Sequence, residues 1–190
     1  MAGRYFGYGS LVNPDARMAD RDFQPAILSG WRRSWSLSGL YQDKGPRICG
    51  LTIEPADGSE IEGVVATRAS SDWSDLDERE RRYNRTPLQP DRLHGVAPGE
   101  TSVYISKPEH LQPATPDNQF LQSYCDCVMQ GYLRVFGEAG MNRFIATTAH
   151  WTPGAMRLDR GDPMYPRAVQ LTSKETTLID AAYRSLGLLG

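Results

Sequence analysis

One acidic residue, Glu80, stands among apolar neighbours in a segment with a helical pattern. If residues 71–83 form an α-helix, its turn of about 100° per residue places Trp73, Leu76, Glu80 and Tyr83 within about 80° of arc. Burying an unpaired carboxylate is costly, so such a group usually has a cationic partner or a raised pKa. A carboxylate with a raised pKa accepts protons near neutral pH, which predicts a general base.

A structural role for Glu80 is the alternative. One of the arginines nearby, for example Arg4 or Arg47, could pair with the carboxylate and only hold the fold together. Structural ion pairs also place acidic side chains on apolar faces, so the position alone does not decide between the two roles.

The second candidate is the loop Gly7-Tyr8-Gly9-Ser10, which follows a short aromatic segment. A strand that ends in a glycine-containing turn can point several backbone N–H groups at a carboxylate or an oxyanion. A simple tight turn has the same composition. The loop lacks the lysine of a phosphate loop and the spacing of a dinucleotide fingerprint, so it does not indicate nucleotide binding.

Nucleophilic and metal chemistry have less support. Ser10 could act as a nucleophile, but it is not part of a G-x-S-x-G elbow and no histidine has a recognisable companion motif. A cysteine nucleophile at position 125 or 127 is no better supported, because cysteine is usually buried and structural. We expect no metal, since no paired ligand spacing occurs among Cys49, Cys125, Cys127, His94, His110 and His150.

The elements that must position these residues divide the chain into two halves. Short strands are predicted at residues 5–8, 26–28, 34–37, 49–53, 61–65 and 102–105. A first helix is predicted at residues 71–83, where Ser71 and Asp72 could cap the start. A second is predicted after Asp117, with Phe120, Leu121, Tyr124 and Val128 on one face, and a third at 141–148. The last is predicted after Thr172, which has capping-box spacing to Glu175.

Strands in the first half and helices in the second indicate an α+β fold, with a small mixed sheet or barrel flanked by helices. The 190 residues are expected to form a single domain, with a C-terminal helical extension from about residue 132.

Composition excludes several classes of protein. The net charge of −2 argues against nucleic-acid binding, which normally requires a concentrated excess of Lys and Arg. No apolar run approaches the length of a membrane-spanning helix, and the N-terminus lacks the pattern of a signal peptide. Three unpaired cysteines suit a reducing compartment. We therefore expect a cytoplasmic protein that binds neither nucleic acid nor membrane.

Several motifs, in order, resemble the gamma-glutamylcyclotransferase-like superfamily, which includes ChaC-type and AIG2-like proteins. Tyr8-Gly9-Ser10-Leu11 is similar to its substrate loop, and the segment from Leu76 to Glu80 is similar to its L-D-x-x-E motif, which ends in the catalytic Glu. Further similarities are the segments 28–33 and 62–65 and the spacing of Tyr124 and Gly131. The resemblance covers residues 4–131; the tail, with Asp159-Arg160 and Tyr165-Pro166-Arg167, fits some bacterial members but suggests no role.

The resemblance implies an enzyme that cyclises a gamma-glutamyl group to 5-oxoproline and releases an amine or amino acid, without any cofactor. Glu80 would be the catalytic acid/base, and substrate would be held by Tyr8, Gly9, Ser10, Leu11 and Tyr124. A surface arginine is the commoner case after a turn, but Arg167 could bind a substrate carboxylate through two hydrogen bonds.

Other outcomes stay open at this point. The donor could be a gamma-glutamyl amino acid, glutathione, a gamma-glutamylamine or a biosynthetic intermediate. A catalytically silent binding or interaction module is the alternative function, although such a module would be expected to have lost Glu80. For the assembly, we expect a monomer or a weak homodimer.

Overall fold

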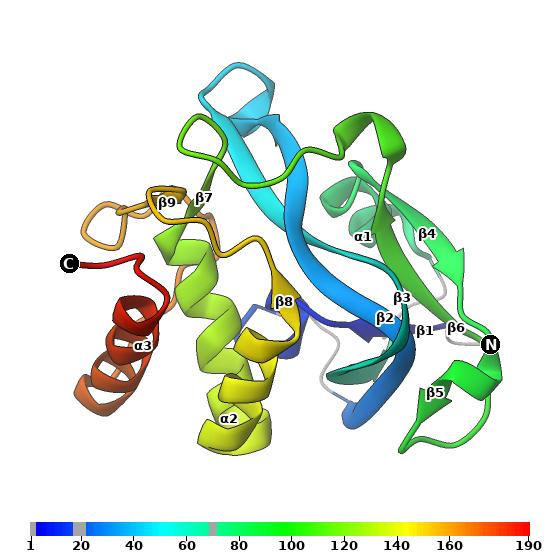
Figure 1. Ribbon diagram of the computed structural model, residues 1–190. Helices are drawn as coiled ribbons and strands as arrows, with labels where there is room; N and C mark the ends of the chain where they lie inside the picture. The colour runs from blue at the N-terminus through cyan, green and yellow to red at the C-terminus, as the bar shows by residue number, and fades with distance from the viewer. Residues whose placement is uncertain (1–2, 17–21, 69–71) are drawn as a thin grey trace.

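The computed structural model describes residues 3–16, 22–68 and 72–190, and two long antiparallel strands form its centre. Strand β2 (Phe23–Leu40) pairs with β3 (Arg47–Thr67) along almost their whole lengths (Figure 1). The predicted strands at 26–28 and 34–37 are therefore one strand, as are those at 49–53 and 61–65. The prediction that each of these strands is broken in two was wrong. Irregularities in the pairing, one of them at Gly30, let a long strand bend without ending.

Further strands extend this hairpin into a curled mixed sheet. Strand β1 (Arg4–Gly7) lies antiparallel to β3 and parallel to β6 (Thr101–Ser106), which pairs in turn with β4 (Tyr83–Pro87). The predictions for β1 and β6 are confirmed. Four short strands complete the pairing: β5 (Leu93–His94), β7 (Gln119–Leu121), β8 (Thr148–Ala149) and β9 (Met156–Arg157). An α+β fold with a small mixed sheet is thus confirmed.

Helix α1 (Ser74–Arg79) is much shorter than the predicted helix at 71–83. Its predicted start at Ser71 lies outside the described residues, while Asp72 accepts a hydrogen bond from the Ser74 amide (2.9 Å). The helix ends early because the chain turns at Glu80, and Tyr83 already belongs to β4. Glu80 is therefore the residue that closes the helix, not one in its interior.

Helix α2 (Gln122–Ala146) contains two helical segments joined at Gly137, whose φ of 70° and ψ of −173° are accessible only to glycine. The second segment contains most of the helix predicted at 141–148, but it ends at Ala146 and Thr148 already belongs to a strand. The helix predicted after Asp117 starts later than expected, because Phe120 and Leu121 belong to β7 and pair with β3 and β9. Among the described residues no helix is both long and apolar enough to cross a membrane.

Helix α3 (Ser173–Ser185) lies beside α2 (Figure 1). Its capping box is confirmed: the Thr172 hydroxyl accepts from the Glu175 amide, and the Glu175 carboxylate accepts from the Thr172 amide. Single-turn 3-10 helices occupy the connections at Ser10–Val12 (η1), Tyr41–Asp43 (η2), Pro90–Arg92 (η3) and Pro108–His110 (η4).

Around β1 and β6 the sheet is covered on both faces, and successive residues of each strand point to opposite sides. On one face, Phe6 and Val103 join a large apolar cluster that also includes residues of α2 and α3. On the other, Tyr5 and Tyr104 pack with Leu76 of α1 in a smaller cluster. The end of β1 therefore lies between the two helical layers, where α1 and α2 can both contribute side chains to one site.

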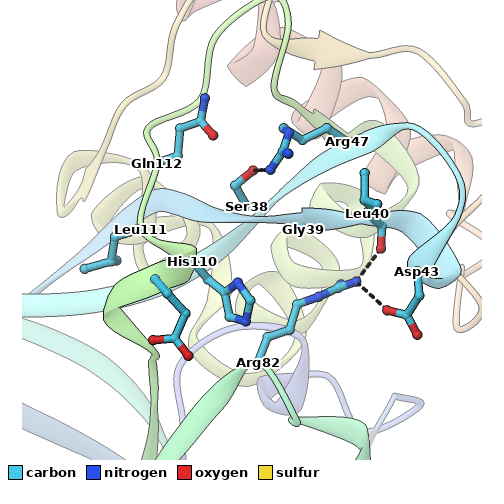
Figure 2. A pocket seen from close by; sticks show the side chains of 10 residues that line it. Ser38, Gly39, Leu40, Asp43, Arg47, Arg82, His110, Leu111 and Gln112 are labelled. Atoms are coloured by element: carbon cyan, nitrogen blue, oxygen red, sulfur yellow. Dashed lines mark hydrogen bonds and ion pairs between the residues drawn. The ribbon is translucent and has the colours of Figure 1, made fainter.

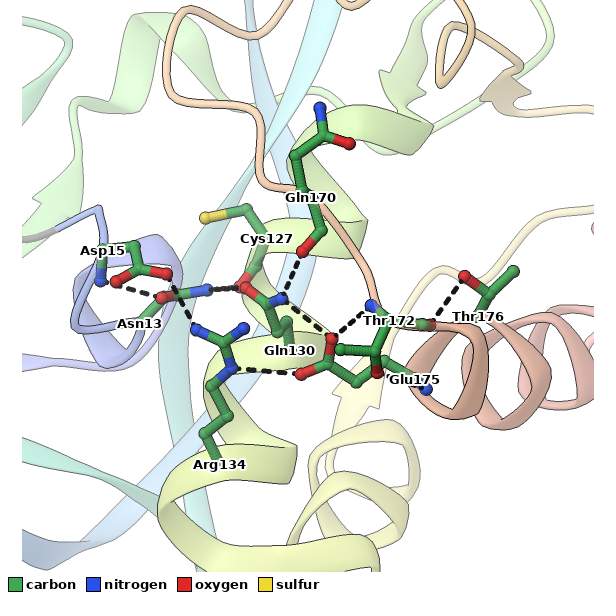
Figure 3. Close-up of polar contacts among 9 residues, drawn as sticks. All are labelled: Asn13, Asp15, Cys127, Gln130, Arg134, Gln170, Thr172, Glu175 and Thr176. Atoms are coloured by element: carbon green, nitrogen blue, oxygen red, sulfur yellow. Dashed lines mark hydrogen bonds and ion pairs between the residues drawn. The ribbon is translucent and has the colours of Figure 1, made fainter.

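A buried polar network ties the end of η1 to both long helices (Figure 3). The Asn13 amide donates to the carbonyl of Cys127 (2.8 Å) and to Gln130 (3.0 Å). Gln130, fully buried on α2, donates to the Glu175 carboxylate (3.1 Å), and Arg134 also binds that carboxylate (3.0 Å). Because buried amides are costly to leave unpaired, this network fixes where the chain after β1 can lie.

Candidate active site

The loop after β1 forms a tight 3-10 turn. Its first backbone hydrogen bond runs from the Val12 amide to the Gly9 carbonyl (2.9 Å), and the next from Asn13 to Ser10 (3.1 Å). Because the first amides of a helical turn have no partner within it, the N–H groups of Ser10 and Leu11 are the ones available to an anion. The role of this loop as a cradle of backbone donors stays a prediction, and these two N–H groups are the ones that would fill it.

The turn is held from behind by Arg33 and Tyr132, both fully buried. The Tyr8 carbonyl accepts from Arg33 Nε (3.2 Å) and from the Tyr132 hydroxyl (2.9 Å). The Tyr8 side chain is also committed, since its hydroxyl donates to the Tyr104 carbonyl (2.6 Å). Burial, and to a lesser extent the charge of Glu80, raises the pKa of Tyr8, so its phenol stays protonated and anchors the loop to β6.

Glu80 lies opposite this loop, where α1 ends. Its amide donates to the Leu76 carbonyl (2.9 Å) and its own carbonyl accepts from the Tyr83 amide (2.7 Å), so the backbone on both sides is fixed. The Glu80 side chain is 14% exposed, and its Oε1 lies 3.1 Å from Arg79 Nε. Burial raises the pKa of the Glu80 carboxyl, although the charges of Arg79 and Arg167 oppose that shift.

An arginine does pair with Glu80, but it is Arg79 and not either of the two examples given, Arg4 and Arg47. Arg4 instead binds the carbonyls of Ala97 (3.0 Å) and Gly99 (2.7 Å), and Arg47 binds Ser38. Sequence reasoning did not single out Arg79, because both of its examples are distant in the chain. The available signal was adjacency: at the end of a helix the backbone turns, so consecutive side chains can face the same cavity.

Arg79 also connects the two halves of the site. Its Nη2 lies 3.2 Å from the Ser10 hydroxyl, and its Nη1 donates to the Ala16 carbonyl (3.0 Å). With a side chain that is only 8% exposed, the guanidinium bridges the loop and the Glu80 carboxylate. One buried cation therefore sets the position of the carboxylate relative to the backbone donors.

The loop and Glu80 border two adjoining cavities. The inner one, of about 30 Å³, is lined by Tyr8, Gly9 and Leu11, and the outer one, of about 300 Å³, opens beyond them. Four residues line both: Ser10, Glu80, Tyr83 and Tyr124. Every residue predicted for the site thus borders one of the two cavities, and Tyr83 and Arg79 join them.

Gly9 makes close approach possible at the junction. A methyl group on its Cα would lie 3.0 Å from the Tyr124 hydroxyl and 3.5 Å from Leu51. We expect Gly9→Ala to lower the free energy of unfolding by about 1–3 kcal/mol through overpacking. Gly161→Ala is the matched control, because nothing lies within 4 Å of that position, and equal denaturation midpoints for the two variants would contradict the prediction.

The alternative nucleophiles lack activating partners. The Ser10 hydroxyl accepts from Arg79, and His94, His110 and His150 border neither cavity. Burial raises the pKa of Cys49 and of Cys127 to about 12, and that of Cys125 further, so all three remain thiols. Within residues 3–16, 22–68 and 72–190, no three metal-binding side chains gather closely enough to share an ion.

A separate cavity of about 290 Å³ lies on the other side of Arg82 (Figure 2). It contains His110 and Arg47 but not Glu80, and the loop after β1 does not reach it. Arg82 borders both this cavity and the outer one, and donates to the Leu40 carbonyl and the Asp43 carboxylate. Its side chain therefore forms a fixed partition between the two.

No family model matches the chain, and no curated protein matches it at a significant level. Solved structures do. A gamma-glutamyl cyclotransferase aligns over 95% of this chain and 99% of its own, with a TM-score of 0.60 and 14% identity. An uncharacterized protein from Homo sapiens aligns over 94% and 98%, with a TM-score of 0.55 and 16% identity. At such low identity the likeness concerns the path of the backbone, and on that ground the chain has the gamma-glutamylcyclotransferase-like fold.

Proposed function

We propose that the protein is a gamma-glutamylcyclotransferase-type enzyme, which converts a gamma-glutamyl compound into 5-oxoproline and a free amine or amino acid. The observation that carries the proposal is the placement of Glu80. Its partly exposed carboxylate borders the same cavities as the donor loop after β1, and Arg79 contacts both.

The reaction is an intramolecular aminolysis. The substrate's α-amine attacks its own γ-carbonyl carbon, a new C–N bond closes the five-membered ring, and the original γ C–N bond breaks. Glu80 would take one proton from the α-ammonium group before the attack and return it to the departing nitrogen. The ring nitrogen loses a second proton after the attack, and that proton also ends on the departing amine. The products are therefore the neutral lactam and an ammonium ion, and no other reactant is needed. Nucleophile and electrophile belong to one molecule, and holding it in a folded conformer supplies much of the acceleration.

The N–H groups of Ser10 and Leu11 would bind the α-carboxylate or the oxyanion that develops on the γ-carbonyl oxygen. Arg79 would hold the Glu80 carboxylate toward the substrate and would partly oppose the effect of burial on its pKa, since its guanidinium lies 3.1 Å away. Tyr124 can orient the substrate through its hydroxyl, which lies beside Gly9. Tyr8, whose hydroxyl already donates to Tyr104, would shape the loop.

The direct test is chromatographic measurement of 5-oxoproline released by the purified protein from gamma-glutamyl-alanine, gamma-glutamylethylamide and glutathione. We expect release from at least one donor at a rate proportional to protein concentration. Binding of these donors without any release would instead indicate a silent binding module. Neither binding nor release from any of them would remove the support for this activity.

A further inference from the structure

The outer cavity is rich in arginine, and most of these side chains are already engaged. Arg79 pairs with Glu80, while Arg81 binds the Asp43 carboxylate through two contacts of 2.9 Å. Arg82 binds the same carboxylate (3.2 Å). These three cations have carboxylate partners within the protein, so none of them is free to serve as the main binding group for an anion.

Arg167 differs from the other arginines of this cavity. It is half-buried, borders the cavity, and has no hydrogen-bond or ion-pair partner among the described residues. Tyr165, two residues earlier, also borders the cavity, and its hydroxyl oxygen is buried without a hydrogen-bond partner in the described part of the chain. An unpaired cation and a buried, unused hydroxyl in one cavity are the groups that an anionic ligand would satisfy.

The backbone that carries these two side chains is firmly fixed. The Met164 amide donates to the Asp159 carboxylate (2.9 Å), and the Met164 carbonyl accepts from the Tyr41 hydroxyl (2.8 Å). The Tyr165 amide donates to the hydroxyl of Ser123 (3.2 Å), at the start of α2. A subsite on this segment would be preorganised, so little conformational entropy would be lost on binding.

The position of the pair indicates which part of a substrate it faces. Arg167 and Tyr165 border the outer cavity only, whereas the donor loop and Glu80 border the inner one. With the glutamyl group at the loop and Glu80, the group attached to the γ-carbonyl extends into the outer cavity. Resting on the proposed function, we propose that Arg167, aided by Tyr165, binds a carboxylate on the leaving group, so that the enzyme selects gamma-glutamyl amino acids or peptides over gamma-glutamylamines.

The test uses two substrates that differ only in this carboxylate: gamma-glutamyl-alanine and gamma-glutamylethylamide. For the wild type we expect kcat/KM to favour the alanine compound by about 10- to 100-fold, the range for a charged hydrogen-bonded contact. Arg167→Gln should bring this ratio close to one, and Tyr165→Phe should lower it several-fold. Arg157→Gln, at an exposed arginine on β9, is the control and should keep the wild-type ratio.

A binding measurement separates the subsite from catalysis. Calorimetric titration of Glu80→Gln protein with the two compounds should give a Kd about tenfold lower for gamma-glutamyl-alanine. Adding Arg167→Gln should abolish that difference. Preferential binding without turnover in the wild type would sink the proposed activity yet support the subsite. Equal binding of both compounds, binding of neither, or a preference that survives Arg167→Gln would overturn the subsite.

Discussion

Glu80→Gln is expected to lower the rate of 5-oxoproline formation by about 10²- to 10⁴-fold, the usual contribution of a positioned general base. Glutamine keeps the size of the side chain and can still accept a hydrogen bond from Arg79, so the fold should be retained. Glu78→Gln is the matched control, because that side chain is 77% exposed on the same helix. Similar rates in the wild type and in Glu80→Gln would exclude Glu80 as the base.

The raised pKa of Glu80 also predicts how the activity depends on pH. Burial raises it, so the ionised form is disfavoured by folding and kcat/KM should fall as the pH drops through the raised value. The contribution of Glu80 to the free energy of unfolding has the opposite dependence on pH. Any stabilisation by the protonated form is complete below the unfolded pKa and is lost as the pH rises through the folded pKa. Because glutamine does not titrate, Glu80→Gln should lack this contribution to the pH dependence of Tm, which calorimetry across a pH series measures.

Arg33→Met is expected to have the second large effect, on stability. Its guanidinium donates to the Tyr8 carbonyl, to Thr147 (2.7 Å), to Tyr132 (2.6 Å) and to the Glu62 carbonyl, with no carboxylate of the described residues within ion-pair distance. The Tyr132 hydroxyl has one proton and contacts both carbonyls, so without Arg33 at least one carbonyl is left unpaired. We expect a loss of about 2–4 kcal/mol, because each buried polar group left unpaired costs about 1–3 kcal/mol.

The control for Arg33 is the residue before it. Arg32 points to the opposite face of β2, is 51% exposed and pairs with Glu54 at the surface. Because exposed ion pairs contribute about 0–1 kcal/mol, Arg32→Met should change the free energy of unfolding only slightly. Denaturant titration measures both variants, and equal losses would show that the acceptors around Arg33 find other partners.

Local chemistry made parts of the fold predictable from the sequence. The aromatic run before Gly7 and the capping box at Thr172 each depend on a few adjacent residues, and both elements appear as expected. The ends of helices and strands that depend on distant pairing partners could not be predicted from the sequence. Phe120 matched a helical stripe as well as a strand, and its pairing with Cys49 and Met156 places it in β7.

Glu80 was singled out by a prediction that was itself wrong, namely that it lies inside a helix over residues 71–83. Glu80 faces inward because it closes α1 at a turn, not because it continues a helical stripe. The stripe nevertheless selected side chains that do meet, since Trp73, Leu76 and Tyr83 pack in one apolar cluster. Arg79 and Tyr165 were missed because their contacts with Glu80 and the outer cavity depend on the ends of elements, where sequence patterns carry the least information.

The order in which the strands leave the ribosome differs from the order in which they can pair. Strands β2 and β3 meet across a short turn, so their hairpin closes with little loss of chain entropy. Strand β1 is synthesised first, yet its neighbour β6 is synthesised much later. The hydroxyl that donates to the Tyr8 carbonyl belongs to Tyr132, 124 residues further along the chain. Contacts of such long range form slowly. We therefore expect the hairpin to fold early and the loop after β1 to take its final shape only after Tyr132 has emerged.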